Sequence, residues 1–238
     1  MPTPKAIFYD LDGTLRKNQP AGRDLFAEHA IRLGLEIVPE DCLRSARWEH
    51  AYWASSEDLR ADLACFGDGD PAFWRNYSLR QLLALGCSQD QANHYAPLLS
   101  DYMDVAYQPQ DLLFEDAAQT LSGLRQNGYI LAVVSNRHQP FHDYLREKEI
   151  LDYLHFALAA GEVNSWKPDP EIFLQAARRA NLEPGAVVYV GDNYYADVVG
   201  ARRAGLIPVL FDPGKVFPEA DCLVIQTHAQ IFDLLERI

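Results

Sequence analysis

The sequence predicts an α/β protein with a doubly wound parallel sheet and an all-helical subdomain inserted after the first strand. Residues 5–16 and 110–238 alternate short apolar runs with helical segments, which is typical of a parallel sheet covered by helices on both faces. Residues 17–109 carry apolar residues at three-to-four spacing without that alternation, which indicates helices alone. We predict a core domain of residues 1–16 plus 110–238 and a helical cap domain of residues 17–109.

The predicted strands are short apolar runs rich in Val, Ile, Phe and Tyr. They are too short for helices, and their continuous rather than alternating apolar character suits strands buried on both faces. The predicted strands are residues 6–9, 130–134, 156–160, 187–190, 209–211 and 223–225.

Capping signals mark the helices between these strands. Asp169 followed by Pro170 has the pattern of an N-cap and a proline in the first helical turn. Gly128 and Gly205 lie where glycine can act as the C-terminal cap of two other helices. Turn residues inside the insert divide it into about four helices.

Composition and charge exclude several function classes. The chain of 238 residues has 34 Asp and Glu against 21 Lys and Arg, for a formal net charge of −13. Nucleic acids and anionic membranes are bound by clustered positive charge, so we expect neither as a partner. No apolar run reaches the length of a transmembrane helix, and the four scattered cysteines have no metal-binding spacing. We expect a cytoplasmic protein with reduced thiols.

Polar residues cluster where the predicted strands end, the edge at which parallel sheets bind their ligands. They are Asp10, Asp12, Ser135, Asn136, Lys167, Asp192, Asn193 and Asp197. Carboxylates so close together cannot all stay ionised without a cation, and oxygen ligands suit Mg²⁺. A hydroxyl and an ammonium group are donors suited to a phosphoryl group. One Asp can attack phosphorus, and a second can transfer protons.

These residues resemble, in order, the four motifs of the haloacid dehalogenase-like (HAD) hydrolase superfamily. The motifs are Asp10-Leu11-Asp12-Gly13-Thr14, Ser135-Asn136, Lys167 and Gly191-Asp192-Asn193-Tyr194-Tyr195-Ala196-Asp197. The helical insert is similar to the cap of the phosphoglycolate phosphatase-like subgroup. One such motif is a moderate signal, whereas four in order, each after a predicted strand, are a strong one.

The resemblance implies roles for the residues that form the reaction centre. Asp10 would be the nucleophile and a Mg²⁺ ligand, and Asp192 a further ligand. Asp12 would be the general acid and base and would offer its backbone carbonyl to Mg²⁺. Ser135 and Lys167 would complete the catalytic set by holding the phosphoryl oxygens.

Further residues are expected around that centre. The backbone N–H of Asn136 would bind the phosphoryl group, and Asp197 would orient Lys167 or metal-bound water. Asn193 takes a place often held by Ser in the superfamily.

Three more residues are candidates for substrate binding. Thr14 lies in the turn that leads to the cap. Arg16 could reach a second anionic group on the substrate or be a solvated residue of the flap. Trp48, one of several cap aromatics, either lines a substrate pocket or packs in the cap core.

The predicted function is a Mg²⁺-dependent phosphatase that hydrolyses a small phosphorylated metabolite through an aspartyl-phosphate. A departing halide needs no proton, so Asp12 disfavours a 2-haloacid dehalogenase. The lack of Lys in residues 18–109 disfavours a phosphonatase, which needs a cap Lys. A β-phosphoglucomutase-like isomerase stays an alternative, and a non-catalytic phospho-binding protein a weaker one.

The leaving group stays open at this level among organic acids, sugars and nucleosides. Residues 18–109 contain seven Arg and fourteen Asp and Glu. This balance disfavours a polyanionic leaving group unless an Arg points into the site.

Overall fold

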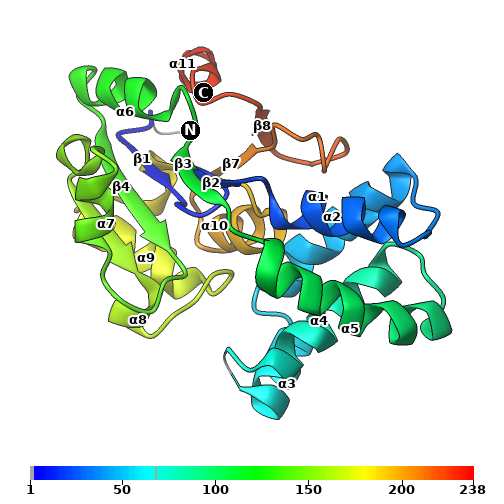
Figure 1. Cartoon of the computed structure of the whole chain (residues 1–238). Helices are drawn as coiled ribbons and strands as arrows, with labels where there is room; N and C mark the ends of the chain where they lie inside the picture. The colour runs from blue at the N-terminus through cyan, green and yellow to red at the C-terminus, as the bar shows by residue number, and fades with distance from the viewer. Residues whose placement is uncertain (1–2, 68) are drawn as a thin grey trace. The chain divides into compact units, whose positions relative to one another are not determined.

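The computed structural model describes residues 3–67 and 69–238 and divides the chain into two compact units (Figure 1). The core unit is Met1–Lys17 with Leu112–Ile238, and the helical unit is Asn18–Asp111. The chain passes between the units at β2 (Arg16–Gln19) and β3 (Gln110–Leu113), which pair in a two-stranded sheet.

The core unit contains a six-stranded sheet in the order β5-β4-β1-β6-β7-β8, and every adjacent pair is parallel. This confirms the predicted fold class. Strand β1 lies between β4 and β6, where the chain reverses its direction across the sheet, and such a point forms a ligand crevice. The strands are β1 (Ala6–Tyr9), β4 (Ile130–Ser135), β5 (Phe156–Ala159), β6 (Val187–Gly191), β7 (Ile207–Phe211) and β8 (Leu223–Ile225).

Helices cover both faces of this sheet, which explains why its strands are apolar throughout. Ile7 and Tyr9 pack with α6 (Ala117–Gln126), α7 (His142–Glu147) and α11 (Gln230–Leu235). Ala6 and Phe8 point to the opposite face and pack with α9 (Pro170–Arg179) and α10 (Val199–Arg203). Successive side chains of one strand therefore enter two different cores.

The helical unit has five helices within its described residues, one more than the sequence suggested. Ser56 causes an additional break, because its side chain accepts from the backbone N–H of Leu59 and caps a new helix. The helices are α1 (Gly22–Arg32), α2 (Pro39–Trp53), α3 (Glu57–Phe66), α4 (Pro71–Ala84) and α5 (Gln89–Ala106).

The β2–β3 ribbon corrects the expectation that residues 17–109 contain helices alone. Strand β2 reads Arg-Lys-Asn-Gln and is largely half-buried, so it has no apolar pattern to reveal it. Its extended form depends on pairing with β3, more than ninety residues later.

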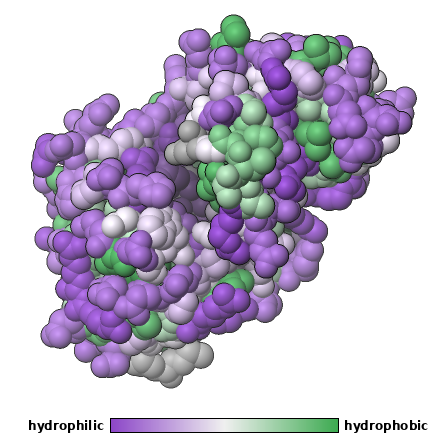
Figure 2. Space-filling model, turned by 90° about the horizontal axis from the view of Figure 1, so that it is seen from below, coloured by the Kyte–Doolittle hydropathy of each residue, from purple (hydrophilic) through white to green (hydrophobic). Residues whose placement is uncertain are grey.

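Hydrophilic residues cover most of the face drawn in Figure 2, in keeping with the net charge of −13. Among residues 3–67 and 69–238, no helix combines the length and apolar character needed to cross a membrane.

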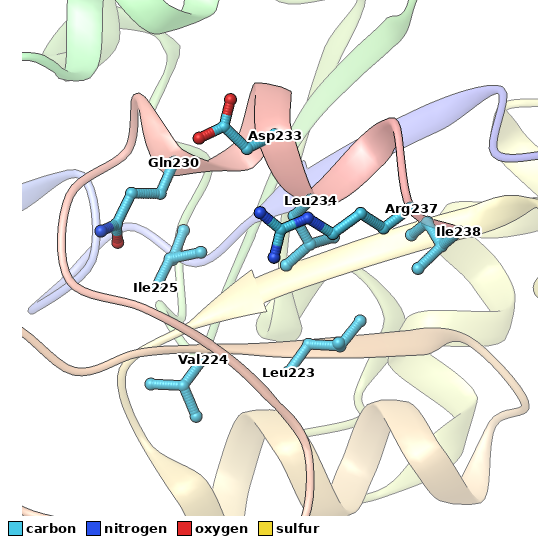
Figure 3. Close-up of a pocket in the computed structure, with 8 residues that line it drawn as sticks. All are labelled: Leu223, Val224, Ile225, Gln230, Asp233, Leu234, Arg237 and Ile238. Carbon is cyan, nitrogen blue, oxygen red and sulfur yellow. The ribbon is translucent and has the colours of Figure 1, made fainter.

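A groove lies at the edge of the sheet between β8 and α11 (Figure 3). Apolar side chains of β8 form one wall, and α11 contributes Asp233 and Leu234 to the other. Two strands, β6 and β7, separate β8 from β1. The groove is therefore a separate feature from the residues that follow β1.

Candidate active site

The candidate site begins at the carboxyl end of the central strand. Asp10 follows β1 directly, and its backbone N–H donates to the carbonyl of Val190 on β6 at 2.8 Å. Only 6% of Asp10 is exposed. Because β1 lies between β4 and β6, the residues that end these three strands meet at one edge of the sheet.

Lys167 is the buried cation of this edge and lies in the loop between α8 (Ala160–Val163) and α9. Its Nζ donates to Asp10 Oδ1 at 2.6 Å, Asp197 Oδ1 at 2.7 Å and Tyr189 Oη at 3.2 Å. Burial alone would lower the pKa of Lys167, but Asp10 and Asp197 hold that pKa well above its ordinary value. Lys167 therefore stays protonated and links the two carboxylates.

Tyr189 is a member of this cluster that sequence reasoning missed. Its hydroxyl donates to the carbonyl of Val134 at 2.9 Å and so bridges β6 and β4 beneath Lys167. Tyr189 lies inside an apolar strand, and no local pattern separates it from ordinary core residues.

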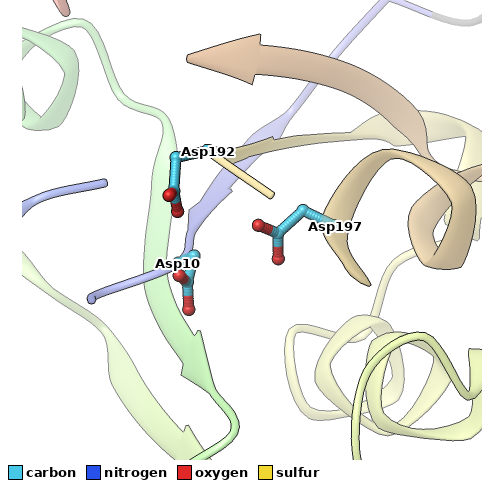
Figure 4. Close-up of side chains that lie close together, drawn as sticks. All are labelled: Asp10, Asp192 and Asp197. Atoms are coloured by element: carbon cyan, nitrogen blue, oxygen red, sulfur yellow. The ribbon is translucent and has the colours of Figure 1, made fainter. Parts of the chain in front are cut away.

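Three carboxyl groups face one another beside Lys167. Oxygens of Asp10, Asp192 and Asp197 lie within 4.8 Å of one another, and Figure 4 shows the three groups turned toward a common space. Burial raises the pKa of Asp10 to about 7, although Lys167 opposes the shift. Burial and the neighbouring Asp197 raise the pKa of Asp192. Burial disfavours the ionised form of these carboxyl groups, and a bound cation would compensate for their charge. Oxygen ligands of this kind suit a hard divalent cation such as Mg²⁺.

The turn after β1 holds Asp192 in place. Thr14 is fully buried, and its hydroxyl donates to Asp192 Oδ1 at 3.1 Å while accepting from the Asp192 backbone N–H at 2.9 Å. Gly13 has a φ of +91°, and a Cβ there would lie 2.4 Å from Asp192 Oδ2. Thr14, expected to bind substrate, thus contacts the metal-ligand candidate, and only glycine fits beside it.

Ser135 is the last residue of β4, and Asn136 follows it directly. Ser135 is buried, with its hydroxyl 3.5 Å from Asp12 Oδ2. The Asn136 amide donates to the carbonyl of Lys167 at 3.1 Å, and the Lys167 backbone N–H donates to Asn136 Oδ1 at 2.7 Å. These reciprocal bonds fix the loop that carries Lys167, so the Asn136 side chain helps to position the cation.

The carboxylate of Asp12 is not part of this three-acid cluster and contacts two arginines instead. It accepts two hydrogen bonds from Arg137, at 3.0 and 2.9 Å, and one from Arg16 at 3.2 Å. Arg137 was not singled out from the sequence. Its position directly after Ser135-Asn136, just beyond the strand next to β1, was the available signal.

A sequence profile of the haloacid dehalogenase-like hydrolase family matches residues 4–205 of this chain. The chain belongs to that family. The match covers all of the residues that form the polar edge of the sheet, from Asp10 to Asp197, together with the helical insert.

Several HAD-like proteins resemble this chain over most of their lengths. Haloacid dehalogenase-like hydrolase domain-containing protein 3 from Bos taurus is 31% identical over 91% of this chain and 85% of its own. Glyceraldehyde 3-phosphate phosphatase from Methanopyrus kandleri is 29% identical over 89% and 85% of the two chains. The crystal structure of a 2-haloacid dehalogenase from Pseudomonas syringae superposes with a TM-score of 0.55 and 29% identity, covering 98% and 99%.

In this HAD-like hydrolase, Asn193 shapes the turn that presents Asp197. Its side chain accepts from the backbone N–H groups of Tyr195 and Ala196 at 3.0 Å, which starts the helical turn Tyr194–Val198. Its own backbone N–H donates to Asp197 Oδ2 at 2.9 Å. Asn193 therefore acts on Asp197 through the backbone.

Trp48 belongs to the helical unit and packs in its aromatic cluster. Its ring centroid lies 5.3 Å from that of Tyr52 and 5.2 Å from that of Tyr77. The nearby Trp53 donates from Nε1 to Tyr77 Oη at 3.2 Å and lines a cavity inside this unit. The packing favours the core interpretation for Trp48 and gives Trp53 a place in the cavity wall.

Proposed function

We propose that this chain is a Mg²⁺-dependent phosphatase that hydrolyses a small phosphorylated metabolite through an aspartyl-phosphate on Asp10. The observation that carries the proposal is the buried Asp10 carboxyl, held at 2.6 Å by Lys167 and faced by Asp192 and Asp197. The phosphatases among its relatives, including the glyceraldehyde 3-phosphate phosphatase of Methanopyrus kandleri, support it.

In the first step, a carboxylate oxygen of Asp10 attacks phosphorus and the bond from phosphorus to the ester oxygen breaks. Asp12 gives its proton to the departing alkoxide. Lys167 holds Asp10 Oδ1 and so fixes the direction of the carboxyl group. Ser135, Lys167 and the backbone N–H of Asn136 are proposed to bind the phosphoryl oxygens.

In the second step, water attacks phosphorus and Asp12 takes its proton. The bond between phosphorus and the Asp10 oxygen breaks, which releases inorganic phosphate and restores the carboxylate. One residue serves as acid and then as base, so each cycle returns Asp12 to its starting state.

The acid cluster is proposed to hold the metal ion through Asp10, Asp192 and the backbone carbonyl of Asp12. Bound Mg²⁺ would supply positive charge to the phosphoryl oxygens and to the cluster. Asp197 keeps Lys167 in place at 2.7 Å, and Thr14 keeps Asp192 in place.

Asp12 favours phosphate esters over haloacids as the substrate class. An alkoxide needs a proton as it leaves, whereas a halide does not. The residue two positions after the nucleophile would have no task in a dehalogenase.

The helical unit is proposed to be a cap that binds the leaving group and excludes bulk water. Trp53, Tyr77 and Glu49 line its cavity, and burial raises the pKa of Glu49. A cytoplasmic location also belongs to the proposal, because the four cysteines are all unpaired.

The test is phosphate release from an aryl phosphate and from a panel of phosphorylated metabolites. We expect release with Mg²⁺ and its loss when EDTA removes the metal, with recovery when Mg²⁺ is restored. Release that is equal with and without EDTA would contradict metal dependence, and no release from any compound would contradict the phosphatase itself.

Mg²⁺ should bind more weakly as the pH falls below 7, by about tenfold for each pH unit. The raised pKa of Asp10, about 7, means that this carboxyl holds a proton below that pH. The metal binds the ionised form, so the ion must displace the proton, and the raised pKa of Asp192 acts in the same direction. Above pH 7 the Asp10 carboxyl is already ionised, so Mg²⁺ has no proton to displace from it.

Calorimetric titration with Mg²⁺ below and above pH 7, in buffers of different ionisation enthalpy, measures both the affinity and the protons released. An affinity that does not change with pH, with no proton release, would contradict the protonated state of Asp10.

A further inference from the structure

Arg137 makes a two-pronged contact with Asp12. Its Nε donates to Asp12 Oδ2 at 3.0 Å and its Nη2 donates to Asp12 Oδ1 at 2.9 Å. This parallel geometry is the one by which a guanidinium group binds a carboxylate or a phosphate. The group is thus already arranged to hold a planar or tetrahedral anion.

The guanidinium of Arg137 is held in position by aromatic rings. It lies 4.4 Å from the ring centroid of Tyr144 and 5.6 Å from that of Phe141. Stacking of this kind orients the guanidinium group and leaves its N–H edge, which we call the fork, to form hydrogen bonds. The backbone carbonyl of Arg137 also accepts from Gly161 at 3.2 Å, which anchors the segment after β4.

A second guanidinium group, that of Arg16, also contacts Asp12. Nη1 of Arg16 is 3.2 Å from Asp12 Oδ1, and 15% of the Arg16 side chain is exposed. The side chains of Arg137 and Asp12 are 29% and 40% exposed. Asp12 and Arg137 are therefore accessible to solvent, and an incoming anion can reach them and compete with the Asp12 carboxylate for a guanidinium group.

The present position of Asp12 conflicts with the task that the proposed function gives it. Both oxygens of its carboxyl group accept hydrogen bonds from arginines. To protonate an alkoxide and later activate water, Asp12 must release at least one of these contacts. A competing anion close to the leaving oxygen would cause that release.

We propose that Arg137, together with Arg16, forms a subsite for a second anionic group on the leaving group. The substrate class is then a phosphate monoester that carries a carboxylate or another phosphate a few atoms from its ester oxygen. When this group binds Arg137, it replaces Asp12 on the fork and frees Asp12 for proton transfer. This inference rests on the proposed function.

The subsite reverses the expectation drawn from the acidic cap. The negative balance of residues 18–109 disfavoured a polyanionic leaving group unless an Arg pointed into the site. Here the arginines come from the core unit, next to Asp12, rather than from the cap.

The test measures binding in the Asp10→Asn background with saturating Mg²⁺, so that it does not depend on turnover. The three probes are 2-phosphoglycolate, 1,3-propanediol bisphosphate and 2-hydroxyethyl phosphate. The leaving groups of the first two carry an anionic group, and we call these the anionic probes. The leaving group of 2-hydroxyethyl phosphate is uncharged, and we call this the neutral probe. With Arg137 present, we expect at least one of the two anionic probes to bind about 10- to 100-fold more tightly than the neutral one. Whichever anionic probe binds more tightly identifies a carboxylate or a phosphate as the group recognised.

Arg137→Gln should remove this preference and affect the neutral probe much less. Arg137→Lys keeps the charge without the fork and should restore only part of the preference. Arg146→Gln is the matched control, because Arg146 is an exposed residue of α7 that pairs with Asp143. Thermal melting of each variant reports whether its fold is retained.

Turnover by the enzyme with an intact Asp10 separates recognition from positioning. A subsite predicts that Arg137→Gln raises KM for the anionic esters more than for the neutral one. If Arg137→Gln changes all three probes by the same factor, Arg137 only positions Asp12 and the subsite is refuted.

The two proposals fail in different ways. A preference that depends on Arg137, found in a protein without phosphatase activity, would retain the subsite and refute the proposed function. Magnesium-dependent turnover without any preference, or no binding of any probe, would refute the subsite.

Discussion

Asp10→Asn should lower kcat by about four orders of magnitude while leaving the fold intact. An amide does not attack phosphorus, so no aspartyl-phosphate can form. In the wild-type protein Lys167 donates a hydrogen bond to Asp10 at 2.6 Å, and the Oδ1 of the introduced Asn can still accept that bond. The melting temperature should stay the same or rise, because the substitution removes a buried carboxyl whose pKa is already raised by burial.

Steady-state phosphate release gives kcat, and mass spectrometry of acid-quenched protein detects the phosphorylated enzyme in the wild type alone. Asp143→Asn is the control, because that carboxylate is 98% exposed and pairs with Arg146. A kcat within tenfold of the wild-type value in pure Asp10→Asn protein would rule out Asp10 as the nucleophile.

Asp12→Asn should impair both chemical steps, to an extent that depends on the leaving group. An alkyl phosphate needs a proton on its leaving oxygen, so its turnover should fall by about 10²- to 10⁴-fold. An aryl leaving group departs without that proton, so Asp10 should still be phosphorylated quickly. Hydrolysis of the aspartyl-phosphate then lacks a base and becomes slow.

The aryl substrate therefore predicts a burst of one equivalent of phenol followed by a slow steady state. Rapid-mixing absorbance measures the burst, and mass spectrometry should find the phosphorylated protein accumulating. The contact from Arg137 can persist, since the Asn amide oxygen still accepts a hydrogen bond. Unchanged turnover of the alkyl ester, or no burst with the aryl ester, would remove Asp12 from the acid and base role.

Lys167 illustrates why the acid cluster is well defined before any metal binds. Its ammonium group joins Asp10 and Asp197 in a buried setting, and Tyr189 connects it to β4. Removing this ammonium group would leave the carboxyl groups of Asp10 and Asp197 facing each other without a compensating charge, which is strongly destabilising, whereas Asp10→Asn still leaves Lys167 paired with Asp197. The same contacts that orient the nucleophile therefore also stabilise the sheet edge.

The local pattern of the chain was sufficient to predict the strands of the core sheet. Each of the six predicted apolar runs overlaps a strand of the structure, because burial of the inner strands on both faces leaves a continuous apolar run. The Asp169–Pro170 helix start was also predicted, and the side chain of Asp169 accepts from Glu171 as an N-cap should.

The helical unit was less predictable at its boundaries. Strand β2 is polar and depends on a partner far along the chain, so no local signal exists for it. The additional helix break at Ser56 involves a capping hydrogen bond from the Leu59 backbone N–H to the Ser56 side chain. Such a side-chain bond offers the backbone an alternative to continuing the helix.

The residue types and the order of the strands define the chemistry available at the sheet edge, because that order brings the carboxyl ends of the strands together. How those groups are used depends on the folded structure. It turned the Thr14 hydroxyl toward Asp192, placed the Asn136 amide on the Lys167 loop and set the Arg137 fork on Asp12. These contacts join residues more than thirty, and up to 178, positions apart, so their geometry depends on packing between strands and loops rather than on any local pattern.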